Sequence, residues 1–219
     1  MFEGFNEATI KYYQAIRKEN SKSVHKENEF LYLEGIKKPL EEMYFELEHY
    51  FSGIDVSLLS SKRRCLSSAY QDARFCRETP IKEYFYIRFK LDRSDKKNKP
   101  GFFFDASLDG YKYGLSIYDM DAGGMEKIRY HILDNKNSAK KVIENFNAAG
   151  LLHVQGEPYK RAHYQEEDAV LRDWLERKRI SFLREGELGR SFFEREILNR
   201  MMAAFDSVKD VYFMLKEAL

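Results

Sequence analysis

Apolar side chains recur with two different periods along the chain, and the change of period divides it into three parts. From about residue 8 to 51, and again from about residue 125 onward, apolar residues recur every three or four positions, as on one face of a helix. Residues 84–89 instead alternate between two faces, and residues 102–108 and 111–118 are further strand-like runs rich in aromatic residues. Grouped strands with helices before and after them predict an α+β fold with a central, mostly antiparallel sheet.

Two breaks in these patterns predict where elements end. Asp109-Gly110 lies between the last two strand-like runs. An Asp-Gly pair in that place predicts a β-hairpin closed by a type I′ turn, whose two central residues need positive φ angles. Pro39 lies inside the helical pattern of residues 25–51, and because proline lacks a backbone N–H we expect the helix to end or kink near Lys38.

The second half of the chain is assigned from apolar spacing alone. We expect helices near residues 125–133, 142–149, 166–178, 191–204 and 207–219, and short strands at residues 151–154 and 180–183. The helix at 166–178 carries the only tryptophan, Trp174. Because the chain has 219 residues and no internal repeat or low-complexity segment, we expect a single domain over residues 1–219.

The amino-acid composition is typical of a soluble protein and gives no sign of a membrane or nucleic-acid-binding protein. Apolar residues make up 43% and charged residues 33% of the chain, which is typical of a folded, soluble domain. The net charge of +1 gives no general attraction to nucleic acid or to an anionic membrane, and no apolar run approaches the roughly 20 residues that span a bilayer. The first residues also lack the layout of a signal peptide. Cys65 and Cys76 form no CxxC pair, so we expect free thiols in a reducing cytoplasm.

The motifs of common catalytic and cofactor sites do not occur in the sequence. Gly123-Gly124 precedes a helix but lacks the spacing of a phosphate-binding loop, and there is no GxSxG nucleophile motif. The histidines show no HxH or HExxH spacing: His25, His49, His131, His153 and His163. We therefore assign no catalytic residue, and we expect neither a cofactor nor a metal ion.

Residues 70–82 place charges of both signs around an aromatic residue and a proline, directly before the strand at 84–89. Asp72 and Arg74 are two residues apart, so in extended backbone they share a face and can form a bidentate ion pair. Phe75 would then point to the opposite face, into the core. A segment this polar beside a core strand either forms a salt-bridged joint or lines a binding site.

The order of residues in this segment resembles the signature R-D-x-R-F-S-x-D-K-x-P-Y-K of a family of conserved hypothetical proteins from bacteria and fungi, a domain of unknown function. Five residues occupy matching positions: Asp72, Arg74, Phe75, Pro80 and Lys82. The departures are Gln71 for arginine, Cys76 for serine, Ile81 for tyrosine, and one residue fewer between Phe75 and Pro80. The chain therefore resembles a divergent member of that family.

The resemblance extends over nearly the whole chain. Further residues in matching order are Phe2, Gly4, Phe5, Asn20, Asn28, Tyr32, Pro39, Tyr113, Gly114, Leu115, Ile128, Arg129, Ile132 and the stretch 175–182. The family has no established activity. The resemblance therefore implies a single α+β domain and a soluble, cytoplasmic protein, but no reaction.

The sequence leaves three functions open, and the first is structural. The simplest interpretation of Asp72, Arg74 and Lys82 is a salt-bridge joint that fixes the loop before the strand to a neighbouring helix. The chain would then be a structural or protein–protein interaction module. The Trp174 helix and the last two helices could dock a protein partner, although their apolar positions are more simply explained as core-facing stripes.

The second function is binding of a small anionic molecule, and the third is that of a degenerate enzyme. Arg74, Lys82 and Arg88 would present donors to a carboxylate or phosphate, beside an apolar wall of tyrosines. Asp72 would orient Arg74 or, in an enzyme, act as general acid or base. The missing signature residues count against catalysis. The predicted ligand-binding residues are Asp72, Arg74, Lys82, Tyr84, Tyr86 and Arg88.

Overall fold

The computed structural model describes residues 1–72, 74, 76, 78–91 and 97–219. Helices come first along the chain: α1 (Glu7–Lys18), α2 (Lys22–Glu27), α3 (Glu29–Tyr32), the π-helical turn η1 (Leu33–Lys37), α4 (Lys38–Ser52), the 3₁₀ turn η2 (Val56–Leu58) and α5 (Lys62–Cys65). Three strands follow: β1 (Tyr84–Lys90), β2 (Lys99–Ser107) and β3 (Gly110–Tyr118). The later elements are α6 (Ala122–Asp134), α7 (Lys136–Ala149), β4 (His153–Gln155), α8 (Ala169–Leu175), β5 (Ser181–Gly186), η3 (Arg190–Phe193), α9 (Glu196–Ser207) and α10 (Lys209–Ala218).

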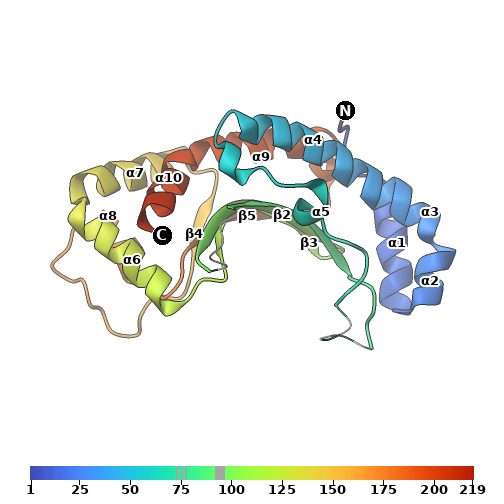
Figure 1. The fold of residues 1–219 in the computed structure, drawn as a ribbon, viewed down its shortest axis with the longest axis horizontal. Helices are drawn as coiled ribbons and strands as arrows, with labels where there is room; N and C mark the ends of the chain where they lie inside the picture. Colours follow the sequence, from blue (N-terminus) through green and yellow to red (C-terminus); the bar gives the residue numbers. More distant parts are fainter. Residues whose placement is uncertain (73, 75, 77, 92–96) are drawn as a thin grey trace. The chain divides into compact units, whose positions relative to one another are not determined.

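The strands, drawn as arrows in Figure 1, form one five-stranded antiparallel sheet. Its strand order is β1-β2-β3-β5-β4. In its β4–β5 pair, Val154 lies opposite Phe182. The predicted α+β fold with a central antiparallel sheet is therefore confirmed. Across the described ranges, every helix is too short or too polar to cross a membrane.

Packing divides the chain into two compact units. Unit 1 comprises residues 1–89, 103–113 and 185–201, and unit 2 comprises residues 90–102, 114–184 and 202–219. The expectation of a single domain over residues 1–219 stays a prediction.

In unit 1, strand β1 separates a buried face from an accessible one, with the alternation expected from the sequence. Phe85, Ile87 and Phe89 are buried, whereas Tyr84 on the opposite face is 40% exposed. The ring of Phe5 lies 4.9 Å from that of Phe85 and contributes to the core on the buried side. We call the other side of β1, which carries Tyr84 and every second residue after it, the open face.

The helical pattern of residues 25–51 changes from α to π geometry just before Pro39, but the helix does not end there, since Tyr32, Lys37 and Lys38 all keep right-handed helical φ and ψ angles. The π-helical turn η1 ends at Lys37, and α4 follows with Pro39 in its first turn. Gly35 in η1 lies so close to α1 that a Cβ atom there would be 2.4 Å from the backbone nitrogen of Thr9. Thr9 Oγ1 also donates a hydrogen bond of 2.6 Å to the Gly35 carbonyl. The π-helical turn η1 thus packs backbone to backbone against α1.

The predicted hairpin between β2 and β3 is present, but its turn is not type I′. Gly110 has a φ of +132°, whereas Asp109 is not among the described residues with positive φ. A type I′ turn needs both. The backbone N–H of Asp109 instead donates to Ser107 Oγ at 3.1 Å. The turn therefore fixes Asp109 through a side chain of the preceding strand.

Unit 2 has a core centred on Trp174. This side chain is fully buried and lies 4.7 Å from the ring of Phe182 and 5.9 Å from that of Phe146. Helix α8 is shorter than the predicted helix at 166–178, and α7 ends at Gly150, whose φ is +61°. The apolar stripe of the Trp174 helix therefore faces the core.

Candidate functional site

Asp72 and Arg74 form the bidentate pair that their spacing predicts, but on a turn rather than on extended backbone. Arg74 Nε and Nη2 donate to the Asp72 carboxylate at 2.9 and 2.5 Å, and the Arg74 backbone N–H donates to it at 3.0 Å. The Cys76 N–H donates to the Asp72 carbonyl, which closes the turn. Hydrogen bonds from Arg74 lower the pKa of Asp72 to about 2. The two side chains thus form an ion pair within one surface turn. The predicted inward position of Phe75 lies outside the described residues.

Lys82, Tyr86 and Arg88 come together on the open face. The guanidinium of Arg88 lies over the Tyr86 ring, 4.0 Å from its centroid, and Lys82 Nζ lies 5.6 Å from the same ring. Lys82 Nζ donates to the Ser68 carbonyl at 3.2 Å. Burial, and then the nearby Arg88, lower the pKa of Lys82. Tyr84 stacks on Tyr86 at 6.3 Å, so four of the six predicted residues adjoin one another.

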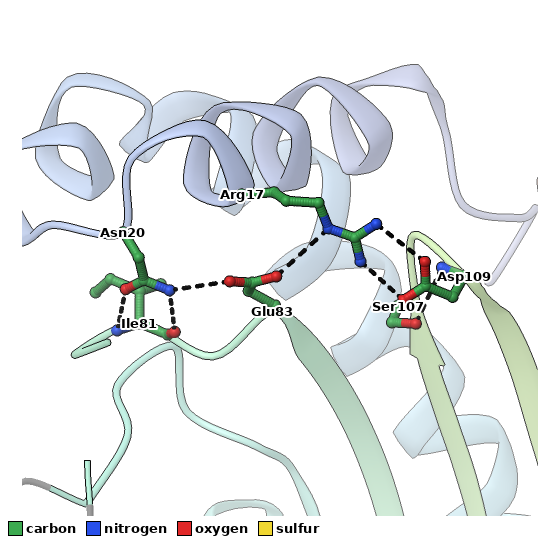
Figure 2. Close-up of polar contacts among 6 residues, drawn as sticks. All are labelled: Arg17, Asn20, Ile81, Glu83, Ser107 and Asp109. Atoms are coloured by element: carbon green, nitrogen blue, oxygen red, sulfur yellow. Dashed lines mark hydrogen bonds and ion pairs between the residues drawn. The ribbon is translucent and has the colours of Figure 1, made fainter. Parts of the chain in front are cut away.

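The joint between helix α1 and the start of β1 is made by residues outside the predicted set (Figure 2). Asn20 clamps Ile81 by accepting from its N–H and donating to its carbonyl, both at 2.9 Å. Arg17 donates to Glu83 at 3.4 Å and to both carboxylate oxygens of Asp109 at 2.9 and 2.8 Å. Helix α1 therefore holds both the loop before β1 and the β2–β3 turn.

A cleft of about 560 Å³ opens in unit 1 beside this joint. It is lined by Tyr84, Arg88, Asp105, Ala106, Ser107, Asp109, Gly110, Tyr111, Lys112, Glu185 and Gly186. Tyr84 and Arg88 are the two predicted site residues among them. Asp72, Arg74, Lys82 and Tyr86 do not line it, although the ring of Tyr86 packs against the Arg88 guanidinium.

Asp105 is a half-buried carboxylate of the cleft. Arg88 Nη2 lies 3.8 Å from Asp105 Oδ1, an ion-pair separation longer than a hydrogen bond. Burial raises the pKa of Asp105 above its ordinary value, while Arg88 and Lys112 act in the opposite direction. Asp105 Oδ1 is inaccessible to solvent and accepts no hydrogen bond from the described protein groups. The cleft thus contains a carboxylate that the protein itself satisfies incompletely.

Unit 2 has a second cleft, of about 950 Å³, whose prominent polar groups are already paired. Asp121 accepts hydrogen bonds from the Gly124 N–H at 2.9 Å and from Asn98 Nδ2 at 3.0 Å, and it caps helix α6. Lys178 Nζ contacts Glu157 at 3.1 Å. These contacts give Asp121 and Lys178 structural roles, and we place the candidate site in unit 1.

The described residues provide no evident metal centre. Throughout those ranges, no three or more His, Cys, Asp or Glu side chains gather closely enough to hold an ion. His25, for example, is buried against Tyr12, with 2.8 Å between the tyrosine hydroxyl and His25 Nδ1. What the cleft can do chemically follows from its arginine, lysine, carboxylates and tyrosines.

Comparison with known proteins places the chain in a family. A family of conserved hypothetical proteins, DUF2461, matches residues 8–213. The chain belongs to this family. No curated protein matches it. Membership in DUF2461 brings no activity with it, so the function has to be argued from the cleft.

Several residues that carry the resemblance to DUF2461 make structural contacts. Asn20 clamps Ile81 at the joint described above. Arg129 is buried and donates to the carbonyls of Leu175 and Arg177 at 2.9 and 2.6 Å, where helix α8 ends. These two positions are explained by packing and hydrogen bonding alone.

Sequence reasoning missed the cleft residues that come from β2, β3 and β5. Asp105 offered a signal, because it is a charged residue inside the strand-like run of residues 102–108. Lys112 and Glu185 offered none, since a lysine or glutamate on one face of a strand is usually solvated. Their common position depends on the pairing of strands that lie far apart in the chain.

Proposed function

We propose that this DUF2461 protein binds a small anionic molecule in the cleft of unit 1. The observation that carries the proposal is a concave site of about 560 Å³ that presents Arg88 and Lys112 beside Tyr84. This volume lies within the range of about 300–1,000 Å³ typical of ligand pockets. Arginine and lysine are the side chains that bind carboxylates and phosphates.

The setting of Arg88 supports this proposal. Its guanidinium is stacked on Tyr86, and a stacked arginine loses little freedom when it engages a planar acid. Lys82 adds positive charge behind the same ring. Lys112 is exposed and lines the cleft from β3. The ligand would therefore meet a fixed guanidinium and a movable ammonium.

The proposal changes the role given to Asp72 and Arg74. Each neutralises the other, and both lie outside the residues that line the cleft. A carboxylate with a pKa of about 2 is a weak general base at neutral pH. This argues against an enzyme that uses Asp72 as its acid or base, and favours a binding domain in which the pair is structural.

A second candidate function is protein interaction through the helices before the sheet. Phe30 in α3 and Phe45 in α4 are 72% and 56% exposed. Phe45 lines a depression of about 290 Å³ together with Leu33 and Lys37 among others. Exposed aromatic residues of this kind mark many interfaces. Light scattering of wild type and Phe45→Ser would detect self-association through this surface.

We also propose that the protein is located in the cytoplasm. Its support is that Cys65 and Cys76 are both free thiols, Cys65 being buried. Free thiols without disulfides are typical of a reducing compartment. Fractionation of cells that express the chain would test this.

A calorimetric screen tests anion binding directly. Wild-type protein is titrated with small carboxylates and phosphates, and the best ligand is then titrated into Arg88→Gln and Lys112→Ala. We expect at least a tenfold loss of affinity in each variant. Arg74→Ala is the matched control, because it removes an arginine outside the cleft and should bind as wild type does. The proposal fails if no anion binds, or if Arg74→Ala loses as much affinity as Arg88→Gln.

A further inference from the structure

The charges that line the cleft are balanced rather than uniformly positive. Asp109 is neutralised by the bidentate pair with Arg17. Of the remaining charged lining residues, Arg88 and Lys112 are cations, and Asp105 and Glu185 are acids. A ligand with negative charge alone would meet repulsion from two carboxylates. Equal numbers of both signs instead match a ligand that carries both.

Asp105 points to the same conclusion by an independent route. Its Oδ1 atom is inaccessible to solvent and accepts no hydrogen bond from the described protein groups. A buried carboxylate oxygen without a donor is costly, so the carboxylate of Asp105 as a whole is short of hydrogen-bond donors. Since Asp105 lines the cleft and its side chain is 21% exposed, a ligand there can supply an N–H or O–H group to the accessible part of this carboxylate.

The spacing of Arg88 and Asp105 limits how far apart the two ligand groups can be. Arg88 Nη2 and Asp105 Oδ1 are 3.8 Å apart. Two ligand groups that meet this pair must therefore be close neighbours. In an α-amino acid the ammonium and the carboxylate are bonded to one carbon, which keeps them within about 3–4 Å of each other.

We propose that the cleft binds a zwitterionic α-amino acid or a small derivative of one, with its carboxylate at Arg88 and Lys112 and its ammonium at Asp105. The inference rests on the proposed function, because it names the ligand class of the same cleft. The rest of the volume of about 560 Å³, between Tyr84 and Tyr111, takes the ligand side chain. Glu185 is the second acid that favours a cationic group.

The test uses three matched forms of one ligand on the wild-type protein. The twenty L-amino acids are screened by calorimetry, together with the carboxylic acids that lack their amino group and the amines that lack their carboxylate. We expect an amino acid to bind at least tenfold more tightly than both of its truncated forms. If the acid without its amino group binds within threefold of the amino acid, the inference is overturned while anion binding stands. If none of the compounds binds, this inference fails, and the phosphates of the first screen then decide whether anion binding stands.

A pair of acid variants then locates the ammonium. Asp105→Asn should lower the affinity for the amino acid by at least tenfold. It should change the affinity for the carboxylic acid that lacks the amino group by less than threefold. Asp72→Asn is the matched control outside the cleft and should leave both affinities unchanged. Equal losses for the amino acid and the truncated acid in Asp105→Asn would refute the assigned contact. Should Asp105→Asn not fold, the wild-type comparison of the three ligand forms decides the question by itself.

Discussion

Arg17 and Asp109 form a bidentate ion pair with distances of 2.9 and 2.8 Å, although 92 residues separate them in the chain. The pair ties the last turn of helix α1 to the β2–β3 turn (Figure 2). Because Asp109 also lines the cleft of unit 1, the same contact partly offsets the negative charge of Asp109 at the candidate site.

Although Arg17 does not line the cleft, its removal should therefore weaken anion binding. In Arg17→Ala the carboxylate of Asp109 has no bidentate partner and repels an anion in the cleft, so we expect a several-fold loss of affinity by calorimetry. Asp109→Asn in the same background should restore it. Unchanged affinity in Arg17→Ala would show that Asp109 lies too far from the bound ligand to matter.

The Asp72–Arg74 pair should be visible in the acid titration of the protein. The pKa of Asp72 is lowered to about 2, below its ordinary 3.8, because Arg74 stabilises the ionised form. The pair therefore contributes to stability above about pH 4, and that contribution is lost as the pH falls from 4 to 2. NMR titration should place the Asp72 midpoint near 2 in wild type and near its ordinary value in Arg74→Gln. Identical midpoints in the two proteins would contradict the bidentate contact.

The sequence predicted local features well because they depend on neighbouring residues. The alternation of β1 and the Asp72–Arg74 pair follow from spacings of a few residues. Pro39 did not end the helix, because the first turn of α4, where it lies, tolerates a residue without a backbone N–H. The type I′ turn was wrong because Ser107 holds the Asp109 N–H in another geometry. Local pattern cannot tell which neighbouring side chain will compete for a backbone donor.

The cleft could not be predicted, because strand pairing creates it. Arg88, Asp105, Lys112 and Glu185 come from four different strands of the sheet. No short-range spacing relates them, and their register is set by packing on the buried face. Tyr84 and Arg88 line the same cleft because both follow the period-two alternation of one strand, and their role as site residues stays a prediction.

Glu46 and Arg195 anchor the first residues of the chain, and their loss should lower stability. Arg195 donates two hydrogen bonds to Glu46 and a third, of 2.8 Å, to the Phe2 carbonyl, while Glu46 accepts from the Phe2 N–H at 2.7 Å. We expect Glu46→Ala to lower the free energy of unfolding by about 1–3 kcal/mol, the size typical of hydrogen bonds to charged groups. Urea denaturation measures this.

The control for this prediction is an ion pair of the same type at the surface. Arg190 pairs with Glu194 at 2.7 Å and is 87% exposed. Arg190→Ala should leave the urea midpoint unchanged, because water replaces the lost contact. Equal effects of Glu46→Ala and Arg190→Ala would mean that the Phe2 anchor does not stabilise the fold.

Gly35 should tolerate no side chain. A Cβ atom there would lie 2.4 Å from the Thr9 nitrogen, so Gly35→Ala must push α1 away from η1. We expect a loss of about 1–3 kcal/mol in the free energy of unfolding, as for other overpacked sites. Gly53→Ala is the matched control: its nearest neighbour would be 3.5 Å away, which is ordinary contact. A neutral Gly35→Ala would contradict the close approach of the two segments.

His25 should make the stability of the protein depend on pH near neutrality. It is buried among aromatic rings, with Tyr12, Tyr32 and Tyr70 as edge-on neighbours. Burial lowers the pKa of His25 below its ordinary 6.5, and Glu29 opposes this only in part. The folded state therefore holds fewer protons on this ring than the unfolded state, so stability should fall as the pH drops below about 6.5.

Urea denaturation at pH 7.5 and pH 5.5 tests this expectation. Wild type should lose more stability between the two pH values than His25→Phe, which has no proton to bind at this position. The variant His49→Asn, at an exposed histidine of helix α4, should keep the wild-type difference. If His25→Phe shows the same difference as wild type, another group titrates in this range, and the contact between Tyr12 and His25 does not govern the response.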